Sequence, residues 1–136
     1  MTVLVDQCLS HKIAVALVAC DWDARAMSSE YGQDCPDTVW LPQVGKRGWV
    51  VLTGDKMIRK RPEERRAFEQ HGVIGVFVPN AIPGQTPLAR MAWVLQALAK
   101  VERVLERAKR GTMLLIGSRH SVSQWSSDAA AWVKAR

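Results

Sequence analysis

Two aspartates stand at the ends of short apolar runs, where a carboxylate is well placed to do chemistry. Asp6 directly follows residues 3–5, and Asp55 comes two residues after residues 50–53. In an open parallel sheet, ligands bind outside the carboxyl ends of the strands. If the two runs are neighbouring strands, both carboxylates point into one crevice, and we therefore predict an acidic site there.

Other acids are candidates for the same crevice. Asp37 opens a short helix predicted over residues 37–41, just before the second of these strands. Asp34 stands close to it, although a loop residue is the simpler interpretation. For each aspartate the alternative is structural, because an aspartate after a strand often caps the next helix or forms a turn.

Gathered carboxylates predict a divalent cation, because they repel one another and are costly to ionise together without one. Mg²⁺ and Mn²⁺ favour oxygen ligands in near-octahedral geometry. A hydrolase uses such an ion to generate hydroxide and to neutralise the charge of a phosphoryl transition state. We therefore predict Mg²⁺, or Mn²⁺, as the cofactor.

The segment that follows Asp55 is strongly basic. Residues 56–66 contain six Lys and Arg side chains and only two acids. Such cations supply sequence-independent affinity for nucleic-acid phosphates. A solvated helix start with paired Glu and Arg is the alternative, and it fits residues 63–66 but not the cations before them. We predict phosphate binding by Lys56, Arg59, Lys60 and Arg61.

The elements that position these residues alternate between strand and helix. We predict strands at residues 3–5, 49–53, 73–78 and 113–116, helices at 11–17, 37–41, 63–70 and 88–110, and a final helix after Asp128 that carries Trp132. Residues 20–31 could hold a further short strand. This order indicates an α/β domain with three layers and a mostly parallel sheet. The predicted organisation is one domain over residues 1–118 and a C-terminal extension, residues 119–136, that packs on or beside it.

Composition narrows the class of protein. The chain has 136 residues, of which 48% are hydrophobic and 24% charged, which suits one folded domain and argues against disorder. A formal charge of +6 indicates a polyanionic partner. No signal peptide is recognisable, and the longest apolar run, residues 13–20, is far shorter than the roughly 20 residues that span a bilayer. We therefore expect a cytoplasmic protein that does not enter the membrane.

The cysteines and tryptophans suggest packing more than chemistry. The three cysteines are scattered without a CxxC pair, which argues against a structural zinc site or a redox dithiol. The six tryptophans could include a platform for stacked bases, but core or interface anchors are the commoner role.

Taken together, the motifs resemble those of the VapC-type PIN-like domain. They are Val-Leu-Val-Asp at 3–6, Asp-x-x-Trp at 37–40, Arg-Gly-Trp-Val-Val-Leu-Thr-Gly-Asp at 47–55, Ile-Arg-Lys-Arg-Pro-Glu-Glu at 58–64 and Gly-Val-x-Gly-Val-Phe-Val-Pro at 72–79. The segment Leu-Thr-x-Asp-x-x-Ile-Arg is the most specific, and the likeness extends to about Ile116. The resemblance implies a Rossmann-like nuclease domain that binds Mg²⁺ or Mn²⁺ and cleaves RNA.

The resemblance also implies roles for particular residues. Asp6, Asp37 and Asp55 match the acidic residues of the site, and Thr53 would orient the acid that follows it. Arg59 and Arg61 match the basic motif. A fourth acid is common in these domains, and here it is Asp34, Glu64 or none.

The function expected from the resemblance is that of a toxin of a type II toxin–antitoxin pair, a metal-dependent endoribonuclease. A cognate antitoxin is the implied partner, and the long helix over residues 88–110 offers a surface for it or for a homodimer. The rival interpretation is a PIN-like module with a degraded metal site that binds RNA or a partner without cleaving it.

Overall fold

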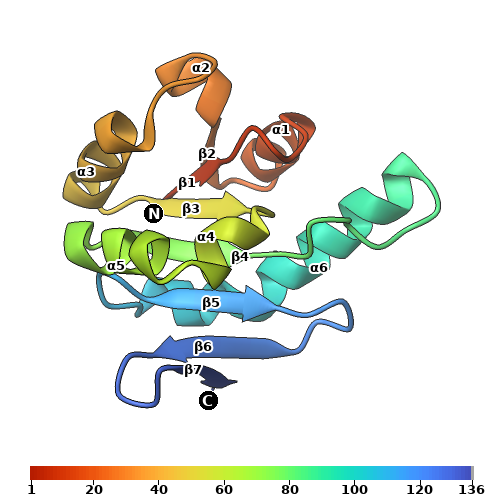
Figure 1. Cartoon of the computed structure of the whole chain (residues 1–136). Coiled ribbons are helices and arrows are strands. Elements are labelled where there is room, and N and C mark those ends of the chain that lie inside the picture. Colours follow the sequence, from red (N-terminus) through yellow and green to blue (C-terminus); the bar gives the residue numbers. More distant parts are fainter. Residues whose placement is uncertain (136) are drawn as a thin grey trace.

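A seven-stranded sheet runs through the protein in the order β2-β1-β3-β4-β5-β6-β7 (Figure 1). The computed structural model describes residues 1–135. The first five strands are parallel, and β6 and β7 are antiparallel. Their bounds are β1 Thr2–Val5, β2 Asp23–Ala26, β3 Val50–Thr53, β4 Ile74–Phe77, β5 Met113–Ile116, β6 Val122–Ser126 and β7 Ala131–Lys134. This confirms the predicted α/β class and the mostly parallel sheet.

Helices cover both faces of the sheet and make it the middle of three layers (Figure 1). Alternate residues of β1 point to opposite faces, as the period of a strand requires. Val3 and Val5 pack in a core with α1 and α6, whereas Leu4 packs in a second core with α3 and α5. The helices are α1 Lys12–Ala19, α2 Met27–Tyr31, α3 Asp37–Arg47, α4 Lys56–Lys60, α5 Pro62–His71 and α6 Pro87–Glu106.

Local signals in the sequence mark several helix ends correctly. Pro62 and Pro87 are the first residues of α5 and α6, where a missing N–H costs nothing. The Thr86 hydroxyl accepts a hydrogen bond from the backbone N–H of Ala89 at 3.1 Å. Gly72 ends α5 with φ of 69°, a left-handed conformation that suits glycine.

Other elements depart from the prediction. The helix that begins at Asp37 is longer than expected and runs to Arg47, while α6 stops at Glu106, short of Arg110. The uncertain region 20–31 holds both β2 and α2. The basic segment after Asp55, expected to precede the helix, begins with a short helix of its own, α4.

The predicted C-terminal helix is wrong. Residues 122–134 form a β-hairpin that continues the sheet, and Asp128 lies in its turn. Trp132 instead packs edge-on against Trp125, with ring centroids 5.5 Å apart. The first strand of the hairpin pairs with the backbone groups along the outer side of β5, which would otherwise form a sheet edge open to solvent. Arg136, the last residue of the predicted extension, lies outside the described residues.

The topology creates one switch point. From β1 the chain passes through α1 to β2 on one side, and β3 lies on the other side of β1 and leads on to β4. Ligands of open α/β sheets bind where the strand order reverses in this way, outside the carboxyl ends of the strands. None of the helices within residues 1–135 has the length and apolar character needed to cross a membrane.

Candidate active site

Asp6 and Asp55 lie at the switch point, at the ends of β1 and β3. The two strands are hydrogen-bonded neighbours, with Val5 opposite Leu52. The backbone N–H of Asp6 continues the ladder by donating to the carbonyl oxygen of Leu52 at 2.9 Å. This register sets Asp6 beside Thr53, so the predicted neighbouring of the two strands is correct.

One hydroxyl group links the two aspartates. Thr53 is completely buried, and its Oγ1 donates a hydrogen bond to Asp6 Oδ2 at 2.7 Å. The same oxygen accepts a hydrogen bond from the backbone N–H of Asp55 at 3.0 Å. Thr53 therefore orients the Asp6 carboxylate directly and Asp55 through its main chain.

Asp55 also caps the short helix α4. Its Oδ1 accepts a hydrogen bond from the backbone N–H of Met57 at 2.9 Å. Within residues 1–135 its Oδ2 has no hydrogen bond. The capping role, considered as the alternative to a ligand role, thus uses one carboxylate oxygen and leaves the second available.

Asp37 and Glu64 belong to the same electrostatic environment. Asp37 is the first residue of α3, and its Oδ1 accepts a hydrogen bond from Trp40 Nε1 at 2.9 Å. Partial burial raises the pKa of Glu64, on α5, and the charges of Asp37 and Asp55 raise that pKa further, although Arg61 opposes them. Of the two alternatives for a fourth acid, Glu64 is therefore the one near the other acids.

Asp34 is placed differently. It is exposed in the loop between α2 and α3, with φ of 60°. Among residues 1–135, neither a hydrogen bond nor an ion pair to a basic residue involves its side chain. The structure therefore gives Asp34 the loop position that was its simpler interpretation.

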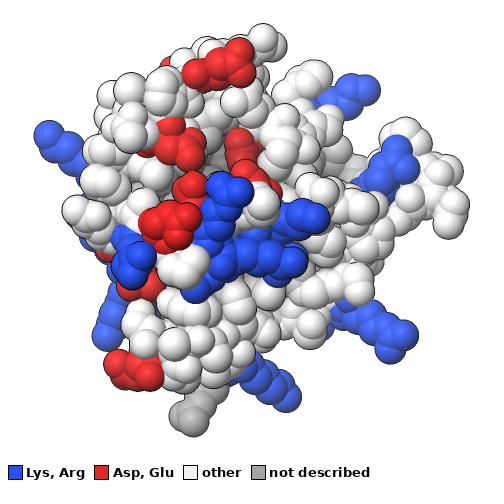
Figure 2. Space-filling view, viewed as in Figure 1, with Lys and Arg blue, Asp and Glu red and all other residues white. Residues whose placement is uncertain are grey.

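A basic surface borders the acids. Figure 2 shows acidic side chains gathered near the middle of this face, next to a band of Lys and Arg over α4 and the start of α5. Lys56, Arg59 and Lys60 lie on α4, and Arg61 joins α4 to α5. All four predicted phosphate ligands thus lie on one segment that begins at Asp55.

The basic segment is supported by a pair of residues, Arg65 and Trp125, that the sequence did not suggest. Arg65 donates a hydrogen bond from Nη1 to the carbonyl oxygen of Arg59 at 2.6 Å. Its guanidinium lies over the ring of Trp125, 4.0 Å from the centroid. Trp125 comes from the C-terminal hairpin, 60 residues away, so no local pattern could have paired them.

Cys8 is a second contact that sequence reasoning missed. Its Sγ lies 3.6 Å from both Asp6 Oδ2 and Thr53 Oγ1. Burial raises the pKa of this thiol, and the Asp6 charge raises it further. The group is thus a neutral S–H beside the carboxylate, and its position two residues after Asp6 was the only available signal.

The carboxyl ends of β1 and β3, with Asp6, Asp55 and the neighbouring Cys8 and Thr53, are called the acidic edge below. Its donor chemistry fits a hard divalent cation. Carboxylate oxygens are the ligands that Mg²⁺ prefers, and Mg²⁺ often takes only one or two from the protein, together with waters and substrate phosphates. Among residues 1–135, no three His, Cys, Asp or Glu side chains are close enough to form a metal-binding group. Among residues 1–135 the acids therefore do not form a complete protein cage, and an ion held by one or two carboxylates is the arrangement that this donor set fits.

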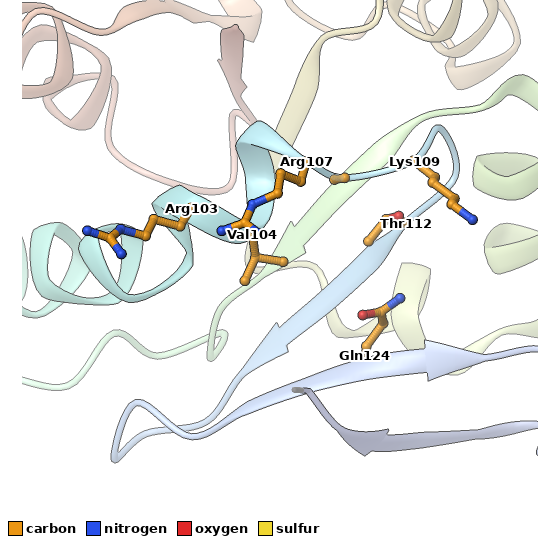
Figure 3. A pocket seen from close by; sticks show the side chains of 7 residues that line it. Arg103, Val104, Arg107, Lys109, Thr112 and Gln124 are labelled. Carbon is orange, nitrogen blue, oxygen red and sulfur yellow. The ribbon is translucent and has the colours of Figure 1, made fainter.

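A separate basic cleft lies between the end of α6 and strands β5 and β6 (Figure 3). Arg103 and Lys109 point away from each other, so their charges do not converge on one position (Figure 3). The residues that line it include no acid. Its chemistry therefore offers no centre comparable to the acidic edge.

Comparison with known proteins assigns the first part of the chain to a family. A family model described as a PIN like domain matches residues 1–80, more than half of the 136 residues. The match contains β1 to β4 and the acidic edge, and it ends before α6 and the C-terminal hairpin. Searches of curated proteins and of solved structures found no match.

Proposed function

Since this chain belongs to the PIN-like domain family, whose fold is of a nuclease type, we propose that it is a metal-dependent endoribonuclease. The observation that carries the proposal is the Thr53 hydroxyl, which links Asp6 and Asp55 at the switch point of the sheet. A buried group that holds two carboxylate-bearing residues together favours a site that must keep a fixed geometry.

Asp6 and Asp55 are the proposed ligands of Mg²⁺ or Mn²⁺. Asp37, predicted as a third ligand, does not form a group of three with them among residues 1–135, so its proposed contribution is negative charge that acts on Glu64. When bound, the ion supplies an activated water and neutralises charge on the phosphate. Glu64 accepts a proton more readily than an ordinary glutamate, because its pKa is raised. It is therefore suited to hold a proton beside the reacting phosphate.

The basic segment supplies the second half of the proposed site. Lys56, Arg59, Lys60 and Arg61 would bind RNA phosphates on either side of the cleaved bond, since they begin directly at Asp55. Such contacts carry no sequence information, so they position the backbone and do not select bases.

Cleavage of a mixed RNA pool tests the proposal. The purified chain is assayed with Mg²⁺, with Mn²⁺ and with a chelator, beside the variants Asp6→Asn and Asp55→Asn. Asparagine is also a good helix cap, so Asp55→Asn should remain folded. Asp34→Asn is the matched control, because it removes one exposed acid outside the site.

We expect metal-dependent cleavage that both site variants lose and the control keeps. Cleavage that survives in folded Asp6→Asn and Asp55→Asn would contradict the assignment.

The rival function is an RNA-binding or partner-binding module with a degraded metal site. One observation favours it: the acids among residues 1–135 do not form a group of three around one position. It predicts RNA binding that weakens with salt and shows no turnover. Calorimetric titration with Mg²⁺ separates the two functions, because the module should show no stoichiometric site.

The biological role that we propose is that of a cytoplasmic VapC-type toxin, held in check by a cognate antitoxin and able to form a homodimer. The likeness of the motifs supports this role, and the family match supports the nuclease part of it. Induced expression in a growing culture tests it. Wild-type protein should arrest growth and Asp55→Asn should not; arrest by both would point to a cause other than cleavage.

A further inference from the structure

A cavity of about 350 Å³ opens beside the acidic edge, between α1 and the beginning of α6. Ile13, Ile82 and Met91 form apolar parts of its wall. Lys12, Asn80 and Arg90 contribute polar groups. A concave, largely apolar site with a few polar groups is the usual form of a small-ligand pocket.

The cavity adjoins the site already described. Cys8 lines it, and the sulfur of Cys8 lies 3.6 Å from Asp6 Oδ2. A ligand in the cavity would therefore be separated from the Asp6 carboxylate by a single side chain. Its size and position suit one unit of a larger substrate that extends across the acidic edge.

The charge of the lining selects an anion. Lys12 and Arg90 are cationic, and no acidic residue lines the cavity. The side chain of Arg90 is tied to the loop before α6, because its Nη1 donates to the carbonyl oxygen of Gly84 at 3.3 Å. The exposed amide of Asn80 offers both a donor and an acceptor at the same edge.

We propose that this cavity binds one nucleotide of single-stranded RNA next to the cleaved bond. This rests on the proposed nuclease function and adds a place where a base is recognised. The base lies against Ile13, Ile82 and Met91, its polar edge meets Asn80, and its phosphate lies near Lys12 and Arg90. An extruded base is commonly held between apolar side chains and read by hydrogen bonds at its edge.

Binding of ribonucleoside 5′-monophosphates to the full chain, in a chelator, tests the pocket without any need for cleavage. The methyl resonances of Met91 and Ile82 in NMR spectra report on it locally. We expect saturable shifts at both methyl groups that differ in strength among the four bases. Inorganic phosphate is the comparison probe, and equal shifts with phosphate alone would overturn base binding.

Three pocket variants have matched controls on the surface. Arg90→Gln and Lys12→Gln should each weaken nucleotide binding by about 3-fold to 10-fold, whereas Arg103→Gln, at the other end of α6, should not. Met91→Trp fills the cavity and should abolish the shifts at Ile82, whereas Gln96→Trp on the exposed face of α6 should leave them. Unchanged affinity in folded Lys12→Gln and Arg90→Gln would overturn the proposal.

The outcome is distinct from that of the nuclease assay. Nucleotide binding at Met91 without RNA cleavage would leave the pocket standing and contradict the enzyme. RNA cleavage without nucleotide binding would support the enzyme and contradict the pocket. If both hold, mapping of the RNA ends should show a base preference in the wild type that Met91→Trp changes.

Discussion

The hydroxyl of Thr53, on β3, donates a 2.7 Å hydrogen bond to the carboxylate of Asp6, on β1. Asp6 is partly exposed at the surface, whereas the threonine side chain is fully buried. Its oxygen also accepts from the main chain of Asp55. The geometry of the acidic edge therefore depends on a residue that carries no charge.

Thr53→Val should damage both stability and cleavage. Valine has the same shape but cannot make either hydrogen bond, so the free energy of unfolding should fall by about 1–3 kcal/mol. Urea unfolding measures this loss, and cleavage should fall as the Asp6 carboxylate loses its orientation. Thr53→Ser should restore most activity, and the exposed Thr38→Val is the control. Wild-type cleavage by Thr53→Val would show that the hydroxyl does not orient the site.

Glu64→Gln should stabilise the metal-free protein at neutral pH. The pKa of Glu64 is raised above its ordinary 4.5, so ionising this carboxyl costs more in the folded than in the unfolded chain. The free energy of unfolding of the wild type therefore falls as the pH rises from 4.5 through the raised pKa of Glu64. The group is only partly buried and solvent screens its charge, so the gain should be at most about 0.5 kcal/mol.

Thermal unfolding of both proteins at several pH values in a chelator measures the effect of Glu64→Gln. The gain should vanish below pH 4.5, where both side chains are neutral. A gain that persists there would have another origin. With Mg²⁺ added, the wild type should gain more stability than the variant if Glu64 faces the ion.

Trp125→Ala should weaken RNA binding from a distance. Trp125 supports Arg65, which in turn holds the carbonyl oxygen of Arg59. Loss of this support should let the basic segment move, so we expect KM for RNA to rise several-fold with a smaller change in kcat. Trp125→Phe keeps an aromatic face for the guanidinium and should retain near-normal KM. A lower kcat at unchanged KM would contradict a positioning role.

Removal of three cations should change the salt dependence of RNA binding. Each phosphate contact to a single strand contributes about 0.7 to the slope of log K against log salt. The triple variant Arg59→Gln, Lys60→Gln, Arg61→Gln should therefore lower the slope by about 2, as measured by fluorescence anisotropy. The control is Arg103→Gln, Arg107→Gln, Lys109→Gln in the other basic cleft. Equal losses of slope would mean that net charge, and not the basic segment, binds RNA.

Local patterns of the sequence determined the class of fold and the position of two acids. Buried strands are continuous apolar runs, and a carboxylate that follows such a run lies at the carboxyl end of the strand, so the places of Asp6 and Asp55 could be predicted without a structure. Helix starts at Pro62 and Pro87 followed from the fixed φ of proline. These features depend on neighbouring residues alone.

Tertiary structure decided the rest. The C-terminal hairpin is held by its pairing with β5, and the support of Arg65 by Trp125 exists only because that hairpin packs beside α5. The raised pKa of Glu64 likewise depends on charges brought close from α3 and from the end of β3. Such contacts join residues far apart in the chain, and a sequence carries no local periodicity that encodes them. The acids could be found from the sequence, whereas their hydrogen-bond partners, the cavity beside them and the support of the basic segment could not.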